Sequence, residues 1–303
     1  MPVIKILIAD DIDISALKIL SSKRFFVKIE IGIFNSEIIR RYNYFDVLII
    51  RSIRNIDKNF LEQTGFKIIA TGSKGTDHID VEFAEEMGIK ILNAEDSNNI
   101  SAAEHTLALI LAIEKSLLFS DQLVRENKFS FYDYERHEIY GKSIGIIGFG
   151  KVGSYVGKLC SAFGMKVYAN DTDKNVVKKN KNFIFKNVKY ILKSCDIVSI
   201  HIPLSKKNLY FITKEKLKLL DKKSILINTS RGDIIDEKYL LKMLIENKIR
   251  SAGLDVFSNE PGINRRFRNL SNVVLSNHIA GKTIESRRRV SENIFRQIRK
   301  FYS

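Results

Sequence analysis

The stretch "SIGIIGFGKVGSYVGKL", residues 143–159, decides the fold of this chain. Its first half is a short apolar run that predicts a buried strand, and its second half is amphipathic and predicts a helix. Between them, Gly148, Gly150 and Gly153 form the pattern G-x-G-x-x-G. Glycines at this spacing allow a tight turn and a close approach of the backbone to a pyrophosphate, which the N-terminus of the helix stabilises. The stretch therefore predicts a Rossmann domain that binds a dinucleotide.

A carboxylate follows the glycine turn at the distance typical of such a domain. Asp171 stands eighteen residues after Gly153, at the end of the predicted strand "MKVYAND" at 165–171. A side chain at this place accepts hydrogen bonds from the ribose hydroxyls and repels a 2′-phosphate. Asp171 therefore favours NAD over NADP, although Lys174 nearby argues in the other direction.

Outward from this stretch, short apolar runs alternate with amphipathic segments along almost the whole chain, which is typical of parallel sheets with helices on both faces. The expected strands of the first domain lie at 3–9, 26–31, 46–51, 67–72 and 89–92. Those of the second begin with the strand before the glycine turn in "KSIGIIGFGKVG" and continue near 165–170, 196–200, 224–228, 250–255 and 273–276. The pattern predicts an α/β protein of two doubly wound parallel-sheet domains. A Rossmann NAD-binding domain at 100–281 is expected to be inserted into a flavodoxin-like substrate domain at 1–99 and 282–303.

The two helices next to the domain boundaries have their own signals. Ser101 and Glu104 have the spacing of a capping box, which predicts the start of a long helix at Ser101 that leads into the second domain. The final helix, "IESRRRVSENIFRQIRKFY" at 284–302, is expected to return and pack on the first domain.

Composition narrows the class of protein. The 303 residues are 45% hydrophobic, and no apolar run reaches the roughly 18 residues of a membrane span. The start "MPVIKILIADDID" lacks a signal peptide, and Cys160 and Cys195 are too few for a disulfide framework, so we expect a cytoplasmic protein without a metal. The net charge of +15 is spread along the chain and is interpreted as compositional bias, so neither nucleic acid nor membrane is expected as a partner.

Polar residues follow three strands of the second domain. Arg231 lies in "NTSRG" at 228–232, Asp255 and Glu260 lie in "LDVFSNEP" at 254–261, and His278 lies in "HIAGKT" at 278–283. Ligands of open parallel sheets bind beyond the carboxyl ends of the strands, so these side chains are expected to converge. A histidine titrates near neutral pH and suits proton transfer, a glutamate can orient its ring, and an arginine matches a carboxylate bidentately. Together they predict reduction of a 2-keto acid or oxidation of a 2-hydroxy acid.

With these motifs in this order, the chain resembles the D-isomer-specific 2-hydroxyacid dehydrogenases over essentially its full length. The resemblance implies that Arg231, Glu260 and His278 are catalytic, and that the subunits form a homodimer through the helix from Ser101 and the segment after it. It also implies NAD contacts from the following residues: Gly148, Gly150, Lys151, Val152, Gly153, Asp171, Thr229, Ser230, Arg231, Asp255, His278 and Gly281. One departure is Asn277, because the family usually has proline before the histidine.

The first domain contains a candidate substrate site. Arg51 and Ser52 follow one predicted strand, and Ser73, Lys74 and Gly75 follow the next. Cationic side chains and free backbone N–H groups at adjacent strand ends predict a pocket for an anion. These segments are most similar to the 3-phosphoglycerate dehydrogenases, which implies oxidation of 3-phosphoglycerate to 3-phosphohydroxypyruvate in serine biosynthesis.

Other functions stay open. The erythronate-4-phosphate dehydrogenases have a similar "HIAG" segment but an additional C-terminal dimerisation domain, and this sequence stops at Ser303. For the same reason, no feedback domain for serine is expected. A glycerate, glyoxylate or lactate reductase would need no phosphate pocket. The same fold also serves in NAD-sensing corepressors, which bind NADH without turnover.

Overall fold

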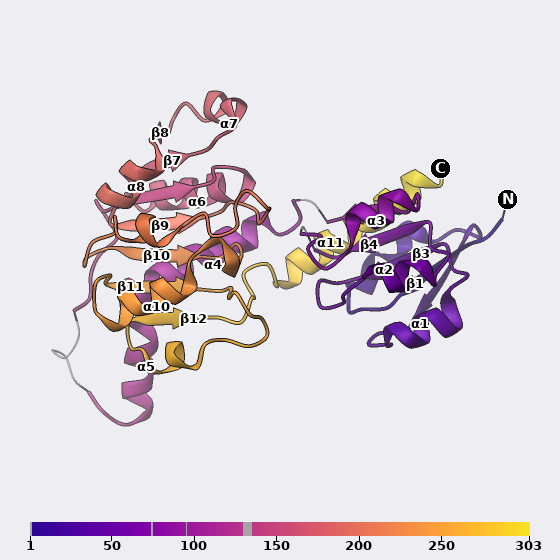
Figure 1. Cartoon of the computed structure of the whole chain (residues 1–303), viewed down its shortest axis with the longest axis horizontal. Helices are drawn as coiled ribbons and strands as arrows, with labels where there is room; N and C mark the ends of the chain where they lie inside the picture. Colours follow the sequence, from indigo (N-terminus) through magenta and orange to yellow (C-terminus); the bar gives the residue numbers. More distant parts are fainter. Residues whose placement is uncertain (1, 74, 95, 130–134) are drawn as a thin grey trace. The chain divides into compact units, whose positions relative to one another are not determined.

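The structure, a computed structural model, describes residues 2–73, 75–94, 96–129 and 135–303 (Figure 1). The chain forms two compact units, the first made of Met1–Asn98 and Lys282–Ser303 and the second of Asn99–Gly281. The second unit is therefore an insertion in the chain of the first. Both contain a parallel sheet, so the predicted fold class is confirmed.

The first unit has a five-stranded parallel sheet in the order β2-β1-β3-β4-β5. Its strands are β1 (Ile4–Ile8), β2 (Phe25–Ile29), β3 (Val47–Ile50), β4 (Ile68–Thr71) and β5 (Lys90–Asn93). Every residue of β3 and β4 is buried, because both faces of the sheet are covered. Its helices are η1 (Ile14–Leu20), α1 (Asn35–Tyr42), α2 (Lys58–Glu62), α3 (Val81–Glu86) and α11 (Ile284–Phe301).

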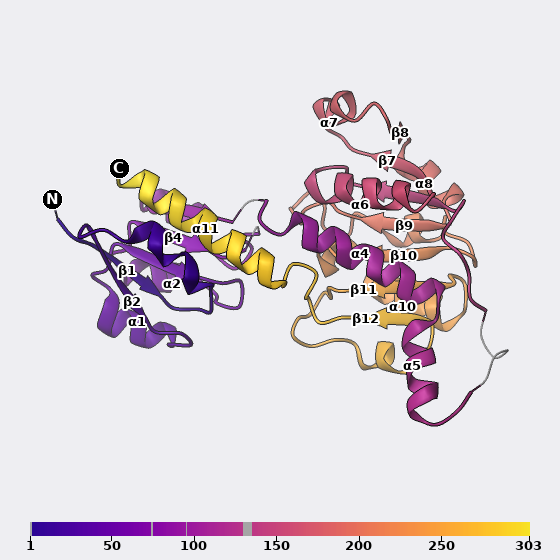
Figure 2. The same cartoon turned by 180° about the vertical axis from the view of Figure 1, so that it is seen from behind.

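Helix α11 covers one face of this sheet. Its side chains Ile294, Phe295 and Ile298 are fully buried and share a core with Ile6 and Ile8 of β1. The views from both sides place α11 and α3 on opposite faces (Figures 1 and 2). The last segment of the chain therefore completes the core of the first unit.

The second unit has a seven-stranded parallel sheet in the order β12-β11-β10-β9-β6-β7-β8. Its strands are β6 (Ser143–Ile147), β7 (Lys166–Asn170), β8 (Ile184–Phe185), β9 (Ile197–Ile200), β10 (Ile225–Asn228), β11 (Ser251–Leu254) and β12 (Val273–Leu275). The chain order reverses at β6, which pairs with both β7 and β9. Parallel sheets bind ligands at such a reversal, beyond the carboxyl ends of the strands.

Helices cover both faces of the second sheet. Helices α4 (Asn99–Glu114) and α6 (Lys151–Ala162) share one core with β6, β9 and β10. The opposite core includes residues of α8 (Val188–Ser194), α9 (Lys214–Leu217) and α10 (Glu237–Ile245). The remaining elements are α5 (Leu117–Arg125), α7 (Lys174–Lys179), η2 (Gly232–Ile234) and η3 (Arg265–Asn269).

The start of α4 differs from the prediction. The helix begins at Asn99, so Ser101 is buried inside its first turn and the predicted capping box is wrong. Asparagine is favoured at the position directly before a helix, and Asn98 occupies that position here. The helical segment is also interrupted at Ser116, whose φ is 47°, and α5 begins at the next residue.

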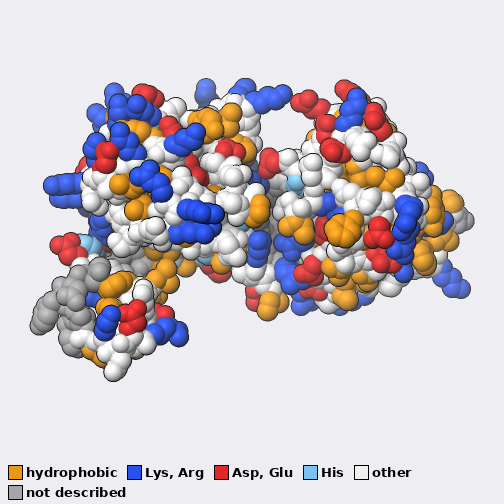
Figure 3. Space-filling view, turned by 60° about the horizontal axis from the view of Figure 1, so that its bottom comes forward, with side chains coloured by type: hydrophobic (Ala, Val, Ile, Leu, Met, Phe, Trp, Pro, Cys, Tyr) orange, Lys and Arg blue, Asp and Glu red, His pale blue; other side chains and the backbone are white. Residues whose placement is uncertain are grey.

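The structure describes the surroundings of the two cysteines and the distribution of charge on the surface. Cys160 and Cys195 are free, and burial raises the pKa of both thiols to about 12, so neither is a reactive nucleophile. On the face drawn in Figure 3, Lys and Arg side chains lie among Asp and Glu side chains. Within the described ranges, no helix has the length and hydropathy to cross a membrane, and no group of three metal-ligating side chains is present.

Candidate active site

The glycine turn connects β6 to α6. Gly148 has a φ of 90°, and a Cβ there would lie 2.7 Å from the carbonyl oxygen of His201. A Cβ at Gly153 would lie 2.1 Å from the carbonyl oxygen of Gly148, so neither position accepts a side chain. A Cβ at Gly150, in contrast, would meet nothing within 4 Å, and Gly150 provides no side-chain cap to α6. This open approach to a helix N-terminus fits the pyrophosphate of a dinucleotide.

Asp171 stands directly after β7 and is tied to this turn. One carboxylate oxygen accepts the N–H of Phe149 at 2.8 Å, and the other accepts the N–H of Asp173 at 2.9 Å. Each oxygen keeps a further lone pair, so the carboxylate is held in place and can still accept hydrogen bonds from ribose hydroxyls.

Arg231 follows β10 on a turn that a buried asparagine organises. The Asn228 side chain is 1% exposed, accepts the N–H and the hydroxyl of Ser230 at 3.0 and 2.8 Å, and donates to the carbonyl oxygen of Arg231 at 2.9 Å. Thr229 is tied to α4, because its hydroxyl lies 3.0 Å from that of Thr106. The sequence analysis did not single out Asn228, although an asparagine that ends a strand before a turn is a known turn signal.

The turn of Arg231 packs tightly on the next loop. A Cβ at Gly232 would lie 2.0 Å from the carbonyl carbon of Phe257, so only glycine fits there. The loop of Phe257 also contains Glu260, whose Oε1 accepts the N–H of Phe257 at 3.0 Å. The missing side chain of Gly232 therefore brings the Arg231 turn against the loop of Glu260.

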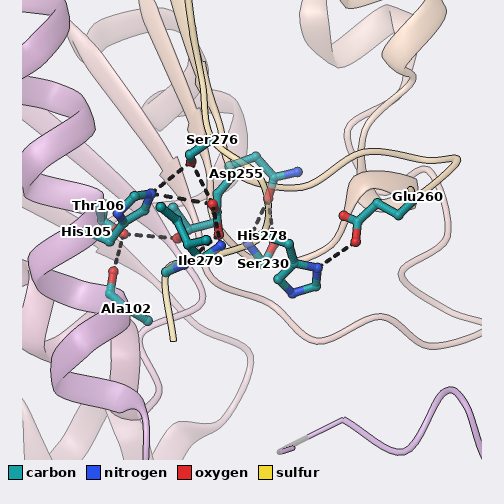
Figure 4. A network of polar contacts seen from close by, with 12 residues as sticks. Ala102, His105, Thr106, Ser230, Asp255, Glu260, Ser276, His278 and Ile279 are labelled. Carbon is teal, nitrogen blue, oxygen red and sulfur yellow. Dashed lines mark hydrogen bonds and ion pairs between the residues drawn. The ribbon is translucent and has the colours of Figure 1, made fainter. Parts of the chain in front are cut away.

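Glu260 and His278 form a direct pair. The Nδ1 of His278 lies 2.6 Å from Oε2 of Glu260 (Figure 4). The two side chains are 40% and 34% exposed, so both are open to a ligand. Because Nδ1 is committed to Glu260, Nε2 is the ring nitrogen that can exchange a proton with a substrate.

Asp255 holds the loop of His278. Its carbonyl oxygen accepts the N–H of His278 at 2.8 Å, and its carboxylate oxygens accept the N–H groups of Ile279 and Ala280, both at 2.9 Å. Burial alone would raise the pKa of Asp255, but hydrogen bonds from His105, Ser276 and this loop outweigh burial and lower it. The charged, fully buried carboxylate therefore anchors the loop, although Asn277 replaces the stiffer proline. The contact of Asp255 with NAD that the resemblance implies stays a prediction.

Arg51 and Ser52 lie just after β3 in the first unit. The N–H of Arg51 donates to the buried carboxylate of Asp10 at 2.8 Å, and its Nη1 donates to the carbonyl oxygen of Asp11 at 3.3 Å. Burial and the positive charge of Arg287 lower the pKa of Arg51. Asp10 also pairs with Arg54 at 2.7 Å, so a buried ion pair that the sequence analysis missed supports this loop.

The other anion-site candidates follow β4. The hydroxyl of Ser73 donates to the carbonyl oxygen of Gly75 at 2.7 Å and lies 2.9 Å from the hydroxyl of Thr71. Thr71 in turn lies 2.8 Å from Nε2 of His78. The Ser73 hydroxyl thus stabilises its own loop, while Lys74 lies outside the described residues.

The structure places the predicted residues in two groups. The cofactor and catalytic candidates all belong to the second unit, where they follow β6, β7, β10, β11 and β12. The described substrate-binding candidates, Arg51, Ser52, Ser73 and Gly75, all belong to the first unit.

Solved structures with the same fold include two with ligands. The acyclic imino acid reductase Bsp5, in complex with NADPH and D-Arg, superposes with a TM-score of 0.87 and 28% identity over 99% of this chain and 97% of that chain. The D-lactate dehydrogenase of Aquifex aeolicus, complexed with NAD and lactic acid, has a TM-score of 0.84 and 25% identity over 98% and 95%.

Relatives at the level of sequence point to one family. The D-3-phosphoglycerate dehydrogenase of Methanocaldococcus jannaschii is 33% identical over 98% of this chain, which spans 57% of that relative's length. The glyoxylate reductase of Pyrococcus furiosus is 35% identical over 84% of this chain and 78% of its own length. Residues 107–280 match the model of the D-isomer specific 2-hydroxyacid dehydrogenase, NAD binding domain. The chain therefore belongs to the D-isomer-specific 2-hydroxyacid dehydrogenase family, and the glycine turn after β6 lies in its NAD-binding domain.

Proposed function

We propose that this protein is an NAD-dependent dehydrogenase that oxidises 3-phosphoglycerate to 3-phosphohydroxypyruvate, the start of serine biosynthesis. The observation that carries the catalytic part is the 2.6 Å pair of His278 and Glu260 on the loop next to the Arg231 turn. A proton donor, its carboxylate partner and an arginine are the groups that a 2-keto acid needs.

Each of these residues has a distinct task in the reduction direction. Arg231 binds the substrate carboxylate bidentately and polarises the adjacent carbonyl group. His278 donates the proton on Nε2 to the carbonyl oxygen, and Glu260 stabilises the imidazolium and fixes the ring. The bound nicotinamide cofactor supplies the hydride chemistry. In the oxidation direction, Nε2 accepts the proton of the substrate hydroxyl.

The glycine turn and Asp171 would hold the cofactor. The pyrophosphate would meet the backbone of Gly150, Lys151 and Val152 at the start of α6, and the adenosine ribose would meet Asp171. The open space beside Gly150 and the fixed orientation of the Asp171 carboxylate support this assignment.

The carboxylate of Asp171 is expected to select NAD(H). Wild-type protein should have a higher kcat/KM with NADH than with NADPH. Asp171→Ala should lower the ratio of these two kcat/KM values about 10- to 200-fold, which is the effect of one charge-assisted contact. Asp173→Ala is the matched control, because it removes an exposed carboxylate from the same loop. Steady-state kinetics with both cofactors measure the ratio. Equal use of NADPH by the wild type, or an unchanged ratio in Asp171→Ala, would contradict this role.

The surroundings of Arg51 are an argument for a phosphorylated substrate. Its backbone is anchored on buried Asp10, and its partly buried guanidinium lies near Arg287, which is itself paired with the carboxylate of Asp11 at 2.7 Å. An arginine held in this way can form charge-assisted hydrogen bonds to a phosphate. The glyoxylate reductase of P. furiosus and the hydroxypyruvate reductase of Thermotoga maritima, both 35% identical, support a second candidate, a reductase of small unphosphorylated 2-keto acids.

A substrate panel distinguishes these candidates. NADH oxidation is measured with phosphohydroxypyruvate, 2-keto-3-hydroxy-4-phosphobutanoate, hydroxypyruvate, glyoxylate and pyruvate. We expect the highest kcat/KM with phosphohydroxypyruvate, about 10- to 200-fold above hydroxypyruvate, which lacks only the phosphate. If kcat/KM is highest with glyoxylate, the proposed phosphate site is refuted, but the assignment as a 2-hydroxyacid dehydrogenase stands. NADH binding without any turnover would favour a sensor protein.

A homodimer is also part of the proposal. Helix α5 has no buried residue, and its side chains Leu117, Leu118 and Val124 are 58%, 56% and 55% exposed. Apolar groups gathered on one short helix are typical of a contact surface. A second copy of the chain would cover them.

A further inference from the structure

A histidine of α4 lies against the loop of His278. The Nε2 of His105 is 2.9 Å from the hydroxyl oxygen of Ser276, the residue that follows β12. That hydroxyl lies 2.6 Å from Oδ1 of Asp255 (Figure 4). A chain of hydrogen bonds thus runs from His105 on α4 through Ser276 to Asp255, which holds the loop of His278. The proposed reaction does not use His105 or Ser276.

The direction of these hydrogen bonds follows from the chemistry of the groups. A charged carboxylate only accepts, so the single hydroxyl proton of Ser276 points to Asp255. The Ser276 oxygen must therefore accept from His105, which places a proton on Nε2 of His105. The same Nε2 lies 3.5 Å from Oδ1 of Asp255. Each donor in the chain thus stabilises the negative charge of Asp255.

The orientation of Asp255 decides the shape of the loop. Its two carboxylate oxygens accept the N–H groups of Ile279 and Ala280, the two residues after His278. His278 has a φ of 55°, in the left-handed region that a side chain other than glycine enters only when neighbours enforce it. In this conformation the ring of His278 meets Glu260.

We propose that His105 is a positioning residue for the proton donor. It acts through Ser276 and Asp255 to keep the loop in the conformation in which His278 pairs with Glu260. The inference rests on the proposed role of His278 but not on the identity of the substrate.

Two substitutions at His105 test this inference. His105→Leu removes the donor and should lower kcat about 2- to 12-fold, the effect of one hydrogen bond, while the Kd of NADH changes less than about twofold. His105→Gln keeps an N–H donor and should restore kcat to within about twofold of wild type. The matched control is His137→Leu, because His137 is 37% exposed and pairs with Glu135, outside this network. It should leave kcat unchanged.

Ser276→Ala tests whether the residues act in series. The double variant with His105→Leu should lose no more activity than Ser276→Ala alone, because the serine transmits the effect of the histidine. The inference is overturned if kcat of His105→Leu equals that of wild type, if the two losses multiply, or if the loss falls on NADH binding. His105→Asn, which is shorter and reaches Ser276 less well, replaces His105→Leu if melting temperatures show that the leucine variant is unfolded.

A further variant separates this inference from the proposed function. If His278→Ala abolishes turnover and His105→Leu does not affect it, only the positioning role fails. If His278→Ala leaves kcat unchanged, the proposed function fails, and the positioning role fails with it.

Discussion

Replacement of His278 by alanine is expected to lower kcat about 100- to 10,000-fold with every 2-keto acid that the protein reduces. In the proposed mechanism the side chain supplies the proton through Nε2, and the structure shows that Nδ1 is committed to Glu260. The Kd of NADH should stay largely unchanged, because the glycine turn and Asp171 are the groups proposed to hold most of the dinucleotide. Steady-state kinetics and a fluorescence titration with NADH measure the two quantities.

The matched control for this variant is His137→Ala, in which an exposed histidine of the same unit is removed. It should have wild-type kcat. A His278→Ala protein that binds NADH and reduces 2-keto acids at the wild-type rate would show that another group donates the proton.

Arg231 and Arg51 are expected to respond differently to the presence of a phosphate. Arg231→Ala should lower kcat/KM about 10- to 200-fold with both phosphohydroxypyruvate and hydroxypyruvate, because both present the same carboxylate. Arg51→Ala should cause a loss of this size with phosphohydroxypyruvate only. The four values of kcat/KM, measured side by side, make each arginine the control for the other.

The informative value is that of Arg51→Ala with hydroxypyruvate. If this variant is slowed equally with both substrates, Arg51 does not bind the phosphate, and 3-phosphoglycerate loses its main physical support. If Arg231→Ala keeps full activity with hydroxypyruvate, the carboxylate is bound elsewhere.

The sequence predicted the strands of this fold well because buried parallel strands are continuous apolar runs. The run at β10, for example, is fully buried and has no alternating pattern to misread. Strand β8 was missed because two residues, Ile184 and Phe185, are too few to show a pattern. The start of α4 was misplaced because Asn98 and Ser101 are both residue types favoured directly before a helix.

In the candidate site, too, the residues that a local conformation requires were predicted, and the contacts between distant segments were not. The sequence predicts the role of a glycine such as Gly148, because a local backbone conformation requires glycine there. The contact of His105 with Ser276 joins residues 171 positions apart, and no local pattern reports which face of α4 meets which strand. Asn228 likewise looks like an ordinary strand end until the turn that it holds is placed in space, and the sequence singled out Asp255 without indicating that it anchors the loop of His278.

The position of α11 has a consequence during synthesis on the ribosome. The core of the first unit includes Ile294, Phe295 and Ile298, yet the whole second unit is translated before them. At about 5–20 residues per second, synthesis of the second unit takes roughly 10–40 s, and the apolar face of the first sheet has no cover from α11 during this time. The nascent first unit therefore exposes this apolar face of its sheet until α11 has been synthesised. A chaperone that binds apolar segments could bind there during that interval.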